Sequence, residues 1–422
     1  MGTKKSYLFV TWEGGGNLPP VLGLAQRLLA RGHNVRILSE PCLRETIESL
    51  GAEFVVFKKH FTRTDRTEDI IQDWNASLLN LPTFENILFG PSMDVAQETM
   101  DAIKAAHTDV VVADLMMVGS LVAAEASGIA GVVLFHMPEY LPGPNRPPGG
   151  FGLIPRTGHI GRFRDRILSI LFNHATNKFL PRLNTVRKSF GLTPMKSVMD
   201  IYQQADLRLI QTCKAFDFPI VPEPENVRYV GPILDDPDWS GSDLVCLPND
   251  DTRPLVVVSL SSTFQNQRQT LVQVIEALAS LPVRGLVTLG PAMARENFKT
   301  YDNVTVLPAI PHSAVFPKAT IVVTHAGHGT VMRALAHGLP LVCLPMGRDQ
   351  TDNAARVIHH GAGLSLSRNA KPKQIAQAIK RVLSEPKFAH KAQHLKKTIL
   401  ADASANLAVK ELEDITSAGL KK

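Results

Sequence analysis

The segment Thr324–Val357 reads THAGHGTVMRALAHGLPLVCLPMGRDQTDNAARV and decides the fold of the chain. An apolar run over 320–325 predicts a buried strand, followed by a glycine-rich turn and a short helix that begins near 328–330. Gly338 ends this helix, and LPLVCLP at 339–345 predicts the next parallel strand. A strand–turn–helix–strand unit of this kind is typical of an open α/β sheet.

The turn between that strand and that helix carries residues suited to binding an anion. The first N–H groups of a helix have no intrahelical partner and carry partial positive charge, which favours a diphosphate. Gly327 and Gly329 allow close approach of the backbone, and His325 and Thr330 add side-chain donors. The glycines alone could equally form a tight β–α turn, so it is the added His and Thr that favour an anion site.

A polar pair, Asp349 and Gln350, follows the next strand at the expected mouth of a cleft. A carboxylate beside an amide can hydrogen-bond the vicinal hydroxyl groups of a sugar. Asp349 also precedes a helical stretch over 351–361 and could act as its N-cap. Both roles are open at this point.

Together these residues resemble the donor-binding motif of inverting, family-1-type glycosyltransferases with the GT-B fold, including plant and bacterial natural-product transferases. The matching positions are His325, Gly327, Thr330, Gly338 with Pro340, and Asp349 with Gln350. The resemblance covers nearly the whole chain and implies an α/β fold of two Rossmann-like, doubly wound parallel-sheet domains facing across a cleft. It also implies metal-independent transfer of a hexose, without a cofactor, from a UDP- or dTDP-sugar to a small hydrophobic acceptor such as a phenol or polyketide.

The same resemblance implies roles for individual residues. The donor diphosphate would contact Ser262, Thr263, His325, Gly327, His328, Gly329 and Thr330. The nucleotide would contact His312 and Arg333, and the sugar would contact Asp349 and Gln350.

Three departures from the family pattern concern the nucleotide. Arg333 stands where many members have a Glu that binds the ribose hydroxyls, and Ala309 replaces an aromatic residue that stacks on the base. Ser261 stands where a Gly is usual. These changes leave the choice between UDP and dTDP open.

The chain has 422 residues, which suggests two domains. Strand and helix patterns alternate in both halves, and a stretch rich in Pro, Asp, Ser and Gly separates them. We expect an N-terminal acceptor-binding domain over 1–231, a linker over 232–253 and a C-terminal donor-binding domain over 254–405. Residues 406–422 would form a C-terminal helix or tail that packs back on the first domain.

A second glycine-rich loop, TWEGGGNLPP at 11–20, follows the first predicted strand. It is an incomplete dinucleotide fingerprint, because Pro19 occupies the third glycine position. Glu40, at the end of the next strand, mimics the ribose-binding acid of that motif. A nicotinamide-dependent oxidoreductase is therefore an alternative, although it leaves the C-terminal motif unexplained.

In the resembling family this loop carries a His that acts as general base, and here Asn17 occupies its position, next to Gly16 in the acceptor pocket. A carboxamide cannot take the proton of the acceptor and can only orient a nucleophile. Asp114, Glu13 and, in third place, His136 could replace it. Each also has a purely structural reading: Glu13 as a loop cap, Asp114 as a helix cap and His136 as pocket lining.

Two further possibilities follow from the missing histidine. An acidic phenol or a carbon nucleophile would need no strong base. Alternatively, the chain is a catalytically weakened member of the fold that binds a ligand or partner. A nucleotide-sugar epimerase would share the fold but form no glycoside.

Two long apolar segments, about 60–100 and 137–192, are candidates for the acceptor side. Within the second, 162–188 contains seven basic residues and one acidic residue around ILSILF. A basic amphipathic helix can lie on an anionic membrane surface, although a solvated helix face over a packed core is commoner.

The composition is that of an ordinary globular protein, with 44% hydrophobic and 20% charged residues. The net charge of +6 suits an anionic ligand, but there is no basic run or RNA-binding motif, so no nucleic-acid partner is expected. Four isolated cysteines predict neither a zinc site nor disulfides, and the acidic stretch 235–238 falls in the linker, so no metal is expected. We expect a cytoplasmic protein, and the sequence leaves its oligomeric state open.

Overall fold

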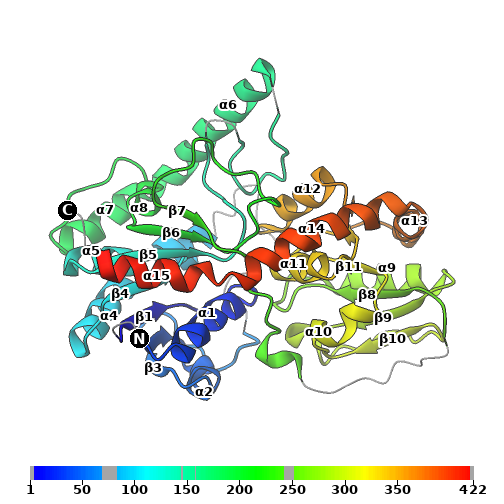
Figure 1. The fold of residues 1–422 in the computed structure, drawn as a ribbon, viewed down its shortest axis with the longest axis horizontal. Helices are drawn as coiled ribbons and strands as arrows, with labels where there is room; N and C mark the ends of the chain where they lie inside the picture. Colours follow the sequence, from blue (N-terminus) through cyan, green and yellow to red (C-terminus); the bar gives the residue numbers. More distant parts are fainter. Residues whose placement is uncertain (1–3, 69–82, 144–145, 157, 242–250, 419–422) are drawn as a thin grey trace.

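The computed structural model describes residues 4–68, 83–143, 146–156, 158–241 and 251–418. Part of the predicted linker (242–250), part of the first acceptor segment (69–82), Cys246 and the last four residues lie outside this description. The described chain forms two parallel β-sheets with helices on both faces, which confirms the predicted α/β fold class (Figure 1). Among the described residues, no helix combines the length and apolar character that crossing a membrane requires.

The N-terminal sheet has seven strands in the order β3-β2-β1-β4-β5-β6-β7, and every pair is parallel. The order reverses between β1 and β4, the switch point at which doubly wound sheets bind ligands. The strands are β1 (Ser6–Val10), β2 (Asn34–Ser39), β3 (Glu53–Val56), β4 (Val110–Asp114), β5 (Ala130–Phe135), β6 (Leu207–Ile210) and β7 (Val227–Tyr229).

The C-terminal sheet has six parallel strands in the order β10-β9-β8-β11-β12-β13, with the switch point between β8 and β11. The predicted strand before the donor motif ends at Thr324, so His325 is the first residue beyond it. The strands are β8 (Leu255–Ser259), β9 (Arg284–Thr288), β10 (Val304–Leu307), β11 (Ile321–Thr324), β12 (Leu341–Cys343) and β13 (Gly363–Ser365).

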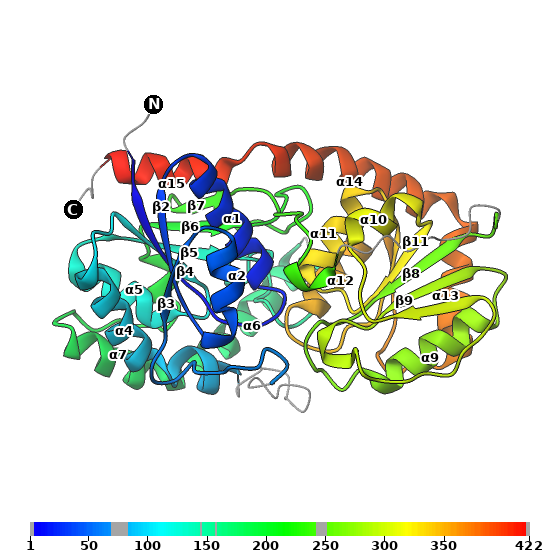
Figure 2. The same cartoon turned by 90° about the horizontal axis from the view of Figure 1, so that it is seen from below.

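Helices connect the strands and cover both faces of each sheet (Figure 2). Helices of the N-terminal half are α1 (Leu18–Ala30), α2 (Arg44–Ser49), α4 (Ser92–Ala105), α5 (Val118–Ser127), α6 (His159–Thr176), α7 (Leu180–Ser189) and α8 (Asp200–Gln203). Those that follow are α9 (Arg268–Ala279), α10 (His312–Val315), α11 (His328–Ala336), α12 (Gln350–His359), α13 (Pro372–Ser384), α14 (Pro386–Ser404) and α15 (Leu407–Ala418). Short 3₁₀ or π turns are η1 (Pro41–Leu43), η3 (Phe84–Phe89), η4 (Asn177–Phe179), η5 (Asp238–Ser240), η6 (Pro291–Met293) and η7 (Phe316–Lys318).

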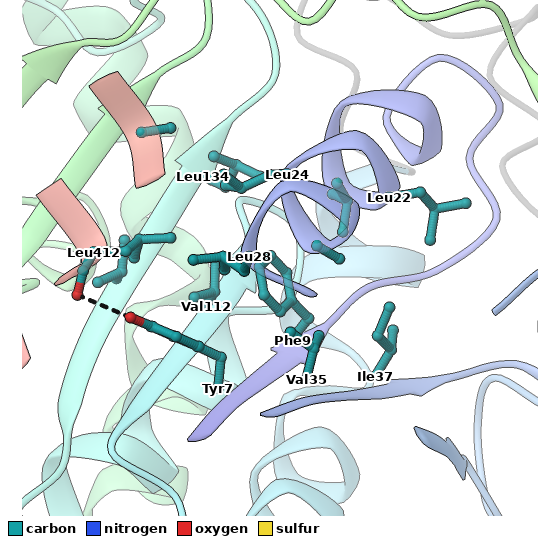
Figure 3. Close-up of a cluster of buried hydrophobic side chains, with 14 of the residues drawn as sticks. Tyr7, Phe9, Leu22, Leu24, Leu28, Val35, Ile37, Val112, Leu134 and Leu412 are labelled. Carbon is teal, nitrogen blue, oxygen red and sulfur yellow. Dashed lines mark hydrogen bonds between the residues drawn. The ribbon is translucent and has the colours of Figure 1, made fainter. Parts of the chain in front are cut away.

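The chain crosses between the halves twice, and the second crossing ties the C-terminus to the first sheet. Helix α14 runs along the C-terminal half, and α15 continues onto α1 of the N-terminal half (Figure 2). Leu412 of α15 joins a core with Phe9 and Leu28, and the Tyr7 hydroxyl donates to the Leu412 carbonyl at 3.4 Å (Figure 3). Burying this apolar face ties the C-terminal half to the first sheet through two consecutive helices, α14 and α15, which Ala405 and Asn406 separate.

Candidate active site between the two sheets

One cavity lies between the carboxyl ends of the two sheets, and residues of both halves line it. The loops after the switch-point strands β1 and β8 meet there. Gly15 has a left-handed φ of +84°, and a Cβ atom at this position would lie 2.6 Å from Cγ2 of Thr263. The three-glycine loop is therefore built for close approach to the opposite sheet as well as for a turn. Among the predicted site residues, those that line the cavity are Gly16, Asn17, His136, Ser262, Thr263, His312, His325, Gly327, His328, Gly329, Thr330, Arg333, Asp349 and Gln350.

Asn17 directly precedes α1 and lines the cavity, but its side chain is engaged in the loop itself. Its Oδ1 accepts from the N–H of Gly14 at 3.0 Å, and its Nδ2 donates to the Trp12 carbonyl and to Oδ2 of Asp114, both at 2.9 Å. The carboxamide thus fixes the glycine loop and Asp114 relative to one another. It has no lone pair suited to accepting a proton.

Asp114, the last residue of β4, lies just behind the cavity wall. Its Oδ1 accepts from the N–H of Met116 at 2.9 Å, in the loop before α5. No side chain caps the N-terminus of α5, so the predicted reading of Asp114 as a helix cap is wrong. On the next strand along, His136 follows β5 and lines the cavity. Its Nδ1 lies 3.7 Å from Oδ2 of Asp114 and is buried without a hydrogen bond to any described residue.

Glu13 does not line the cavity, although it was one of the predicted catalytic groups. Its carboxylate accepts from the N–H of Gly15 at 2.8 Å and from Nε of Arg66 at 2.7 Å. Burial raises the pKa of Glu13, and Arg66 and the Gly15 N–H oppose that rise. The contacts are those of a residue that holds the loop.

Glu40 is also enclosed, and this bears on the dinucleotide alternative. Arg63 donates to its two carboxylate oxygens at 2.5 and 2.6 Å, and the side chain is fully buried. A carboxylate occupied by a buried guanidinium is unavailable to the hydroxyl groups of a ribose.

His325 and Gly327 form the turn between β11 and α11. A Cβ atom on Gly327 would lie 2.4 Å from Nε2 of His325, so only glycine allows the imidazole to rest there. Burial, together with the charge of Arg348, lowers the pKa of His325 to about 4. At neutral pH the ring is uncharged, and it would contribute a hydrogen bond to an anion while the N-terminus of α11 contributes its dipole.

His328 and Thr330 stand in the first turn of α11. The ring of His328 hydrogen-bonds the Thr212 hydroxyl at 2.9 Å, and burial lowers its pKa to about 3. The ring therefore points toward the N-terminal half, which leaves its backbone N–H for a ligand. Thr330 and Gly329 line the cavity beside it.

Hydroxyl groups of the loop after β8 face the same turn. The Ser261 and Thr263 hydroxyls are 3.2 Å apart, and Arg348 donates from Nη1 to the Thr263 hydroxyl at 2.9 Å. Arg348 adopts a left-handed φ of +56°, which is uncommon for a residue with a side chain. Its guanidinium thus adds positive charge beside Ser262 and the helix end.

Asp349 and Gln350 differ in how many hydrogen bonds their side chains already make within the protein. Asp349 precedes α12 and caps no N–H through its side chain; instead its Oδ2 accepts from Nδ2 of Asn353 at 2.7 Å. Burial raises its pKa, against the opposing effect of Asn353. Gln350 is more fully engaged, because its Oε1 accepts from the N–H groups of Met346 and Gly347 and its Nε2 donates to Gln265.

The predicted nucleotide residues anchor the linker. His312 donates its backbone N–H to Asp236 at 2.9 Å and stacks on Phe316, and burial lowers the pKa of its ring to about 3. Arg333 is 8% exposed and donates from Nε to the carbonyls of Leu234 and Asp235 at 3.2 and 3.1 Å. Burial lowers the pKa of Arg333.

Sequence reasoning missed two residues that shape the site. Asn353 donates to the Ala326 carbonyl at 2.9 Å as well as to Asp349, so it joins the two donor-side loops. Asp352 accepts from the N–H groups of Gly150 and Gly152, which brings a loop of the N-terminal half onto α12. The spacing of Asn353 four residues after Asp349 was the available signal.

The N-terminal wall of the cavity is mostly apolar, which suits a hydrophobic ligand. Burial raises the pKa of the two tyrosines in this wall, Tyr140 and Tyr202, so both remain protonated at neutral pH. The described residues contain no group of three or more His, Cys, Asp or Glu arranged to hold a metal ion. The wall is formed by Trp12, Phe84, Leu88, Leu115, Met116, Phe135, Met137, Tyr140, Leu141, Met199 and Tyr202.

Comparison with known proteins gives a consistent assignment. The family described as UDP-glucoronosyl and UDP-glucosyl transferase matches residues 21–402. The 4'-demethylrebeccamycin synthase of Lentzea aerocolonigenes is 29% identical over 404 residues, covering 92% of this chain and 94% of that protein.

Solved structures agree on the fold. The calicheamicin glycosyltransferase CalG4 superposes with a TM-score of 0.75 at 22% identity, and the match covers all of both chains. The spinosyn rhamnosyltransferase SpnG, solved with the spinosyn aglycone, gives a TM-score of 0.66 at 19% identity over 96% of this chain and 99% of that one. A second SpnG structure, with thymidine diphosphate, gives 0.67 at 19% identity over 96% of this chain and 100% of that one.

Proposed function

This chain belongs to the UDP-glucoronosyl and UDP-glucosyl transferase family and is a glycosyltransferase, and we propose that it transfers a hexose from a UDP- or dTDP-sugar to a small, largely apolar acceptor. The observation that carries the proposal is the cavity shared by the two sheets. One wall offers a helix N-terminus, His325 and Asp349, and the other offers apolar side chains with His136 at their edge. Such a cavity can hold a polar donor against an apolar acceptor.

On the donor side, the diphosphate would rest on the first turn of α11, with hydrogen bonds from His325 and the Thr263 hydroxyl. Arg348 would add positive charge to stabilise the leaving group as it departs. The carboxylate of Asp349 would accept from the sugar hydroxyls, while Gln350 would hold the loop that carries it. These contacts concern only the diphosphate and the sugar.

The nucleotide of the donor is proposed to be UDP or dTDP, and Arg333 is the reason for including dTDP. A carboxylate at this position would accept hydrogen bonds from both ribose hydroxyls, whereas a guanidinium only donates. A site with Arg333 therefore gains little from a 2'-hydroxyl, which dTDP lacks. The SpnG structure with thymidine diphosphate lends support by analogy of fold.

The acceptor is proposed to be an aromatic or polyketide-like natural product. The apolar wall supports this class, because burying such a compound removes apolar surface from water on both partners. The names of the rebeccamycin synthase and of the SpnG complex with an aglycone point in the same direction.

We assign the proton transfer to His136, in place of the base that Asn17 does not provide. The acceptor oxygen would attack the anomeric carbon and form the new glycosidic bond, and the carbon–oxygen bond to the diphosphate would break with its electrons on the nucleotide. The acceptor proton would pass to Nε2 of His136, and Asp114 would stabilise the resulting imidazolium from the Nδ1 side. Asn17 would act as a positioning residue through Asp114.

The first experiment is detection of product by mass spectrometry, with UDP-glucose and dTDP-glucose each offered to a panel of phenols, polyketides and sterols. We expect a mass gain of one hexose that is lost in His325→Ala. Product with one nucleotide only would identify the donor.

A negative result would have two meanings that nucleotide-sugar binding distinguishes. Binding without product across the panel would favour the catalytically weakened binding protein. Absence of binding would refute the donor site itself.

A further inference from the structure

Helix α6 carries apolar residues on two opposite faces, and only one of these faces is covered. Of the nine large hydrophobic side chains that are exposed among the described residues, five lie on this helix. Ile160 is 87% exposed and Phe163 is 67% exposed. The five are Ile160, Phe163, Ile167, Ile170 and Leu171.

Their spacing places all five on one stripe. At about 100° per residue, steps of three, four and seven residues return to the same side of an α-helix. The buried residues of α6, including Gly161, Asp165 and Phe172, fall on the opposite side, toward the protein. A solvated helix over a packed core would expose polar residues instead, so the uncovered stripe is unlike an ordinary surface helix.

Basic residues border the stripe without acidic partners. Arg162 and Arg166 are exposed and form no ion pair with any described residue. Three other basic residues of the 162–188 region are neutralised, since Arg164 pairs with Asp165, Arg182 with Glu85 and Arg187 with Glu125. Of the four basic residues of this region without an ion pair to a described residue, Lys178 and Lys188 lie beyond the end of α6, whereas Arg162 and Arg166 lie beside the exposed apolar side chains.

The position of α6 makes the stripe accessible to a flat surface. The helix projects from the N-terminal half, and its N-terminal end stands beyond the rest of the ribbon (Figure 1). Ile160 and Phe163, the two most exposed side chains of the stripe, lie at that end.

We propose that α6 docks the enzyme on an anionic lipid membrane, with the stripe from Ile160 to Leu171 inserted among the lipids and with Arg162 and Arg166 at the headgroups. An apolar stripe flanked by unpaired arginines has the chemistry of an interfacial helix. A second copy of the chain fits less well, because a symmetric contact through this stripe would bring the same arginines together. Two weak contributions, apolar insertion and charge attraction, would make the binding reversible.

Membrane docking is separate from glycosyl transfer, but it would affect how the acceptor reaches the cavity. Helix α6 follows the loop over 146–156, and that loop begins beside Tyr140 and Leu141 of the apolar wall and touches α12 through Asp352. Docking would hold this loop near a membrane in which an apolar acceptor dissolves. Delivery of acceptor from the lipid phase would then be faster than delivery from water.

The test is sedimentation of the full chain with vesicles of phosphatidylcholine, alone or with about one third phosphatidylglycerol. We expect binding to the mixed vesicles, little binding to phosphatidylcholine alone, and weakening as salt is raised. The variant Phe163→Ser/Ile170→Ser should lose about tenfold or more of the affinity. The variant Arg162→Glu/Arg166→Glu should also lose affinity for the mixed vesicles, and its loss relative to the parent should be largest at low salt.

Matched variants on the C-terminal half test whether losing any exposed leucine, or any two positive charges, would weaken vesicle binding equally. Leu400→Gln removes an exposed leucine of α14, and Lys373→Glu/Lys380→Glu makes the same change of charge on α13. Both should bind mixed vesicles as the parent does, and all four variants should keep nucleotide-sugar binding. Equal loss of vesicle binding in the controls would overturn the proposal. So would a stripe-dependent dimer in sedimentation velocity without vesicle binding.

Discussion

The Nδ1 atom of His136 lies 3.7 Å from Oδ2 of Asp114; Asp114 ends β4, and His136 follows the neighbouring strand β5. The same oxygen of Asp114 accepts from Nδ2 of Asn17 at 2.9 Å. The carboxylate is thus held in place for an imidazole that approaches from β5 rather than from the glycine loop. A small movement of the ring would complete a His–Asp pair at the cavity edge.

Replacing His136 by Gln should lower kcat by about a hundredfold or more, because glutamine has similar size but takes no proton. Nucleotide-sugar binding, measured by calorimetry, should be unchanged, since the donor contacts come from the other half. Asp114, Asp349 and His328 face His136 and remain in the variant, so a loss of kcat would be due to the imidazole itself.

His107→Gln is the matched control, because His107 and Asp109 form a His–Asp pair on the surface at 3.1 Å. It should leave the rate unchanged. A normal rate in His136→Gln would instead assign the proton to Asp114 or to a water that Asp114 orients.

The substitution Asn17→His should partly rescue His136→Gln. Position 17 is already within hydrogen-bonding distance of Asp114 and lines the cavity, so an imidazole there could use the same carboxylate. We expect the double variant to regain about tenfold over His136→Gln, as part of the contribution of a general base is restored. Single-turnover measurement separates this gain from product release. No gain, with nucleotide-sugar binding intact, would argue that the acceptor hydroxyl faces His136 and not the glycine loop.

The donor half was predictable because its signals are local. A buried strand, a glycine turn and a helix start are adjacent in the chain, so their order alone places His325, Gly327 and Thr330 at one spot. Parallel pairing of β11 with β8 and β12 then brings the loops after three strands together. The α/β class followed from the same periodicity.

The acceptor half was less predictable because its contacts are long-range. Asp114 and His136 were both recognised at strand ends, but their pairing depends on the register of β4 with β5. The place of Glu13 in the glycine loop predicts a catalytic base, yet Arg66, distant in sequence, occupies its carboxylate. No local pattern shows which carboxylates a remote arginine will neutralise.

A buried ion pair between the two halves should contribute strongly to the free energy of unfolding. Asp217, in the loop after β6, accepts from Nη2 of Arg356 on α12 at 2.6 Å, and both side chains are almost fully buried. Burial tends to raise the pKa of Asp217, but Arg356 and Arg146 outweigh it and hold the pKa below its usual value. Asp217→Asn should cost about 3 to 5 kcal/mol in the free energy of unfolding, because Arg356 is left buried and unpaired.

The effect should depend on pH in a defined direction. A carboxyl group with a lowered pKa stabilises the fold above its unfolded value, about 3.9, and loses that contribution as the pH falls through the lower folded value. The difference between Asp217→Asn and the parent in denaturant unfolding should therefore be full near pH 7 and shrink below about pH 4. Glu48→Ala, which breaks the exposed pair with Arg44, should shift neither quantity measurably. A difference that is constant with pH would contradict the charge-based account.

Comparing Gly15→Ala with Gly32→Ala should separate the effect of backbone strain from the effect of a steric clash in the cleft. Both substitutions strain the backbone, but an alanine Cβ at position 32 would have no neighbour within 4 Å. Both glycines have left-handed φ values, +84° and +86°, but only at Gly15 does an added Cβ meet another residue, 2.6 Å from Thr263. Each alanine should cost about 1 to 3 kcal/mol of stability. Gly15→Ala alone should also push the two switch-point loops apart and lower kcat/KM by about tenfold or more, since reacting groups must meet within a fraction of an ångström. Equal activity losses in the two variants would mean that strain acts through the fold, and that the contact between the glycine loop and Thr263 has no part in bringing donor and acceptor together.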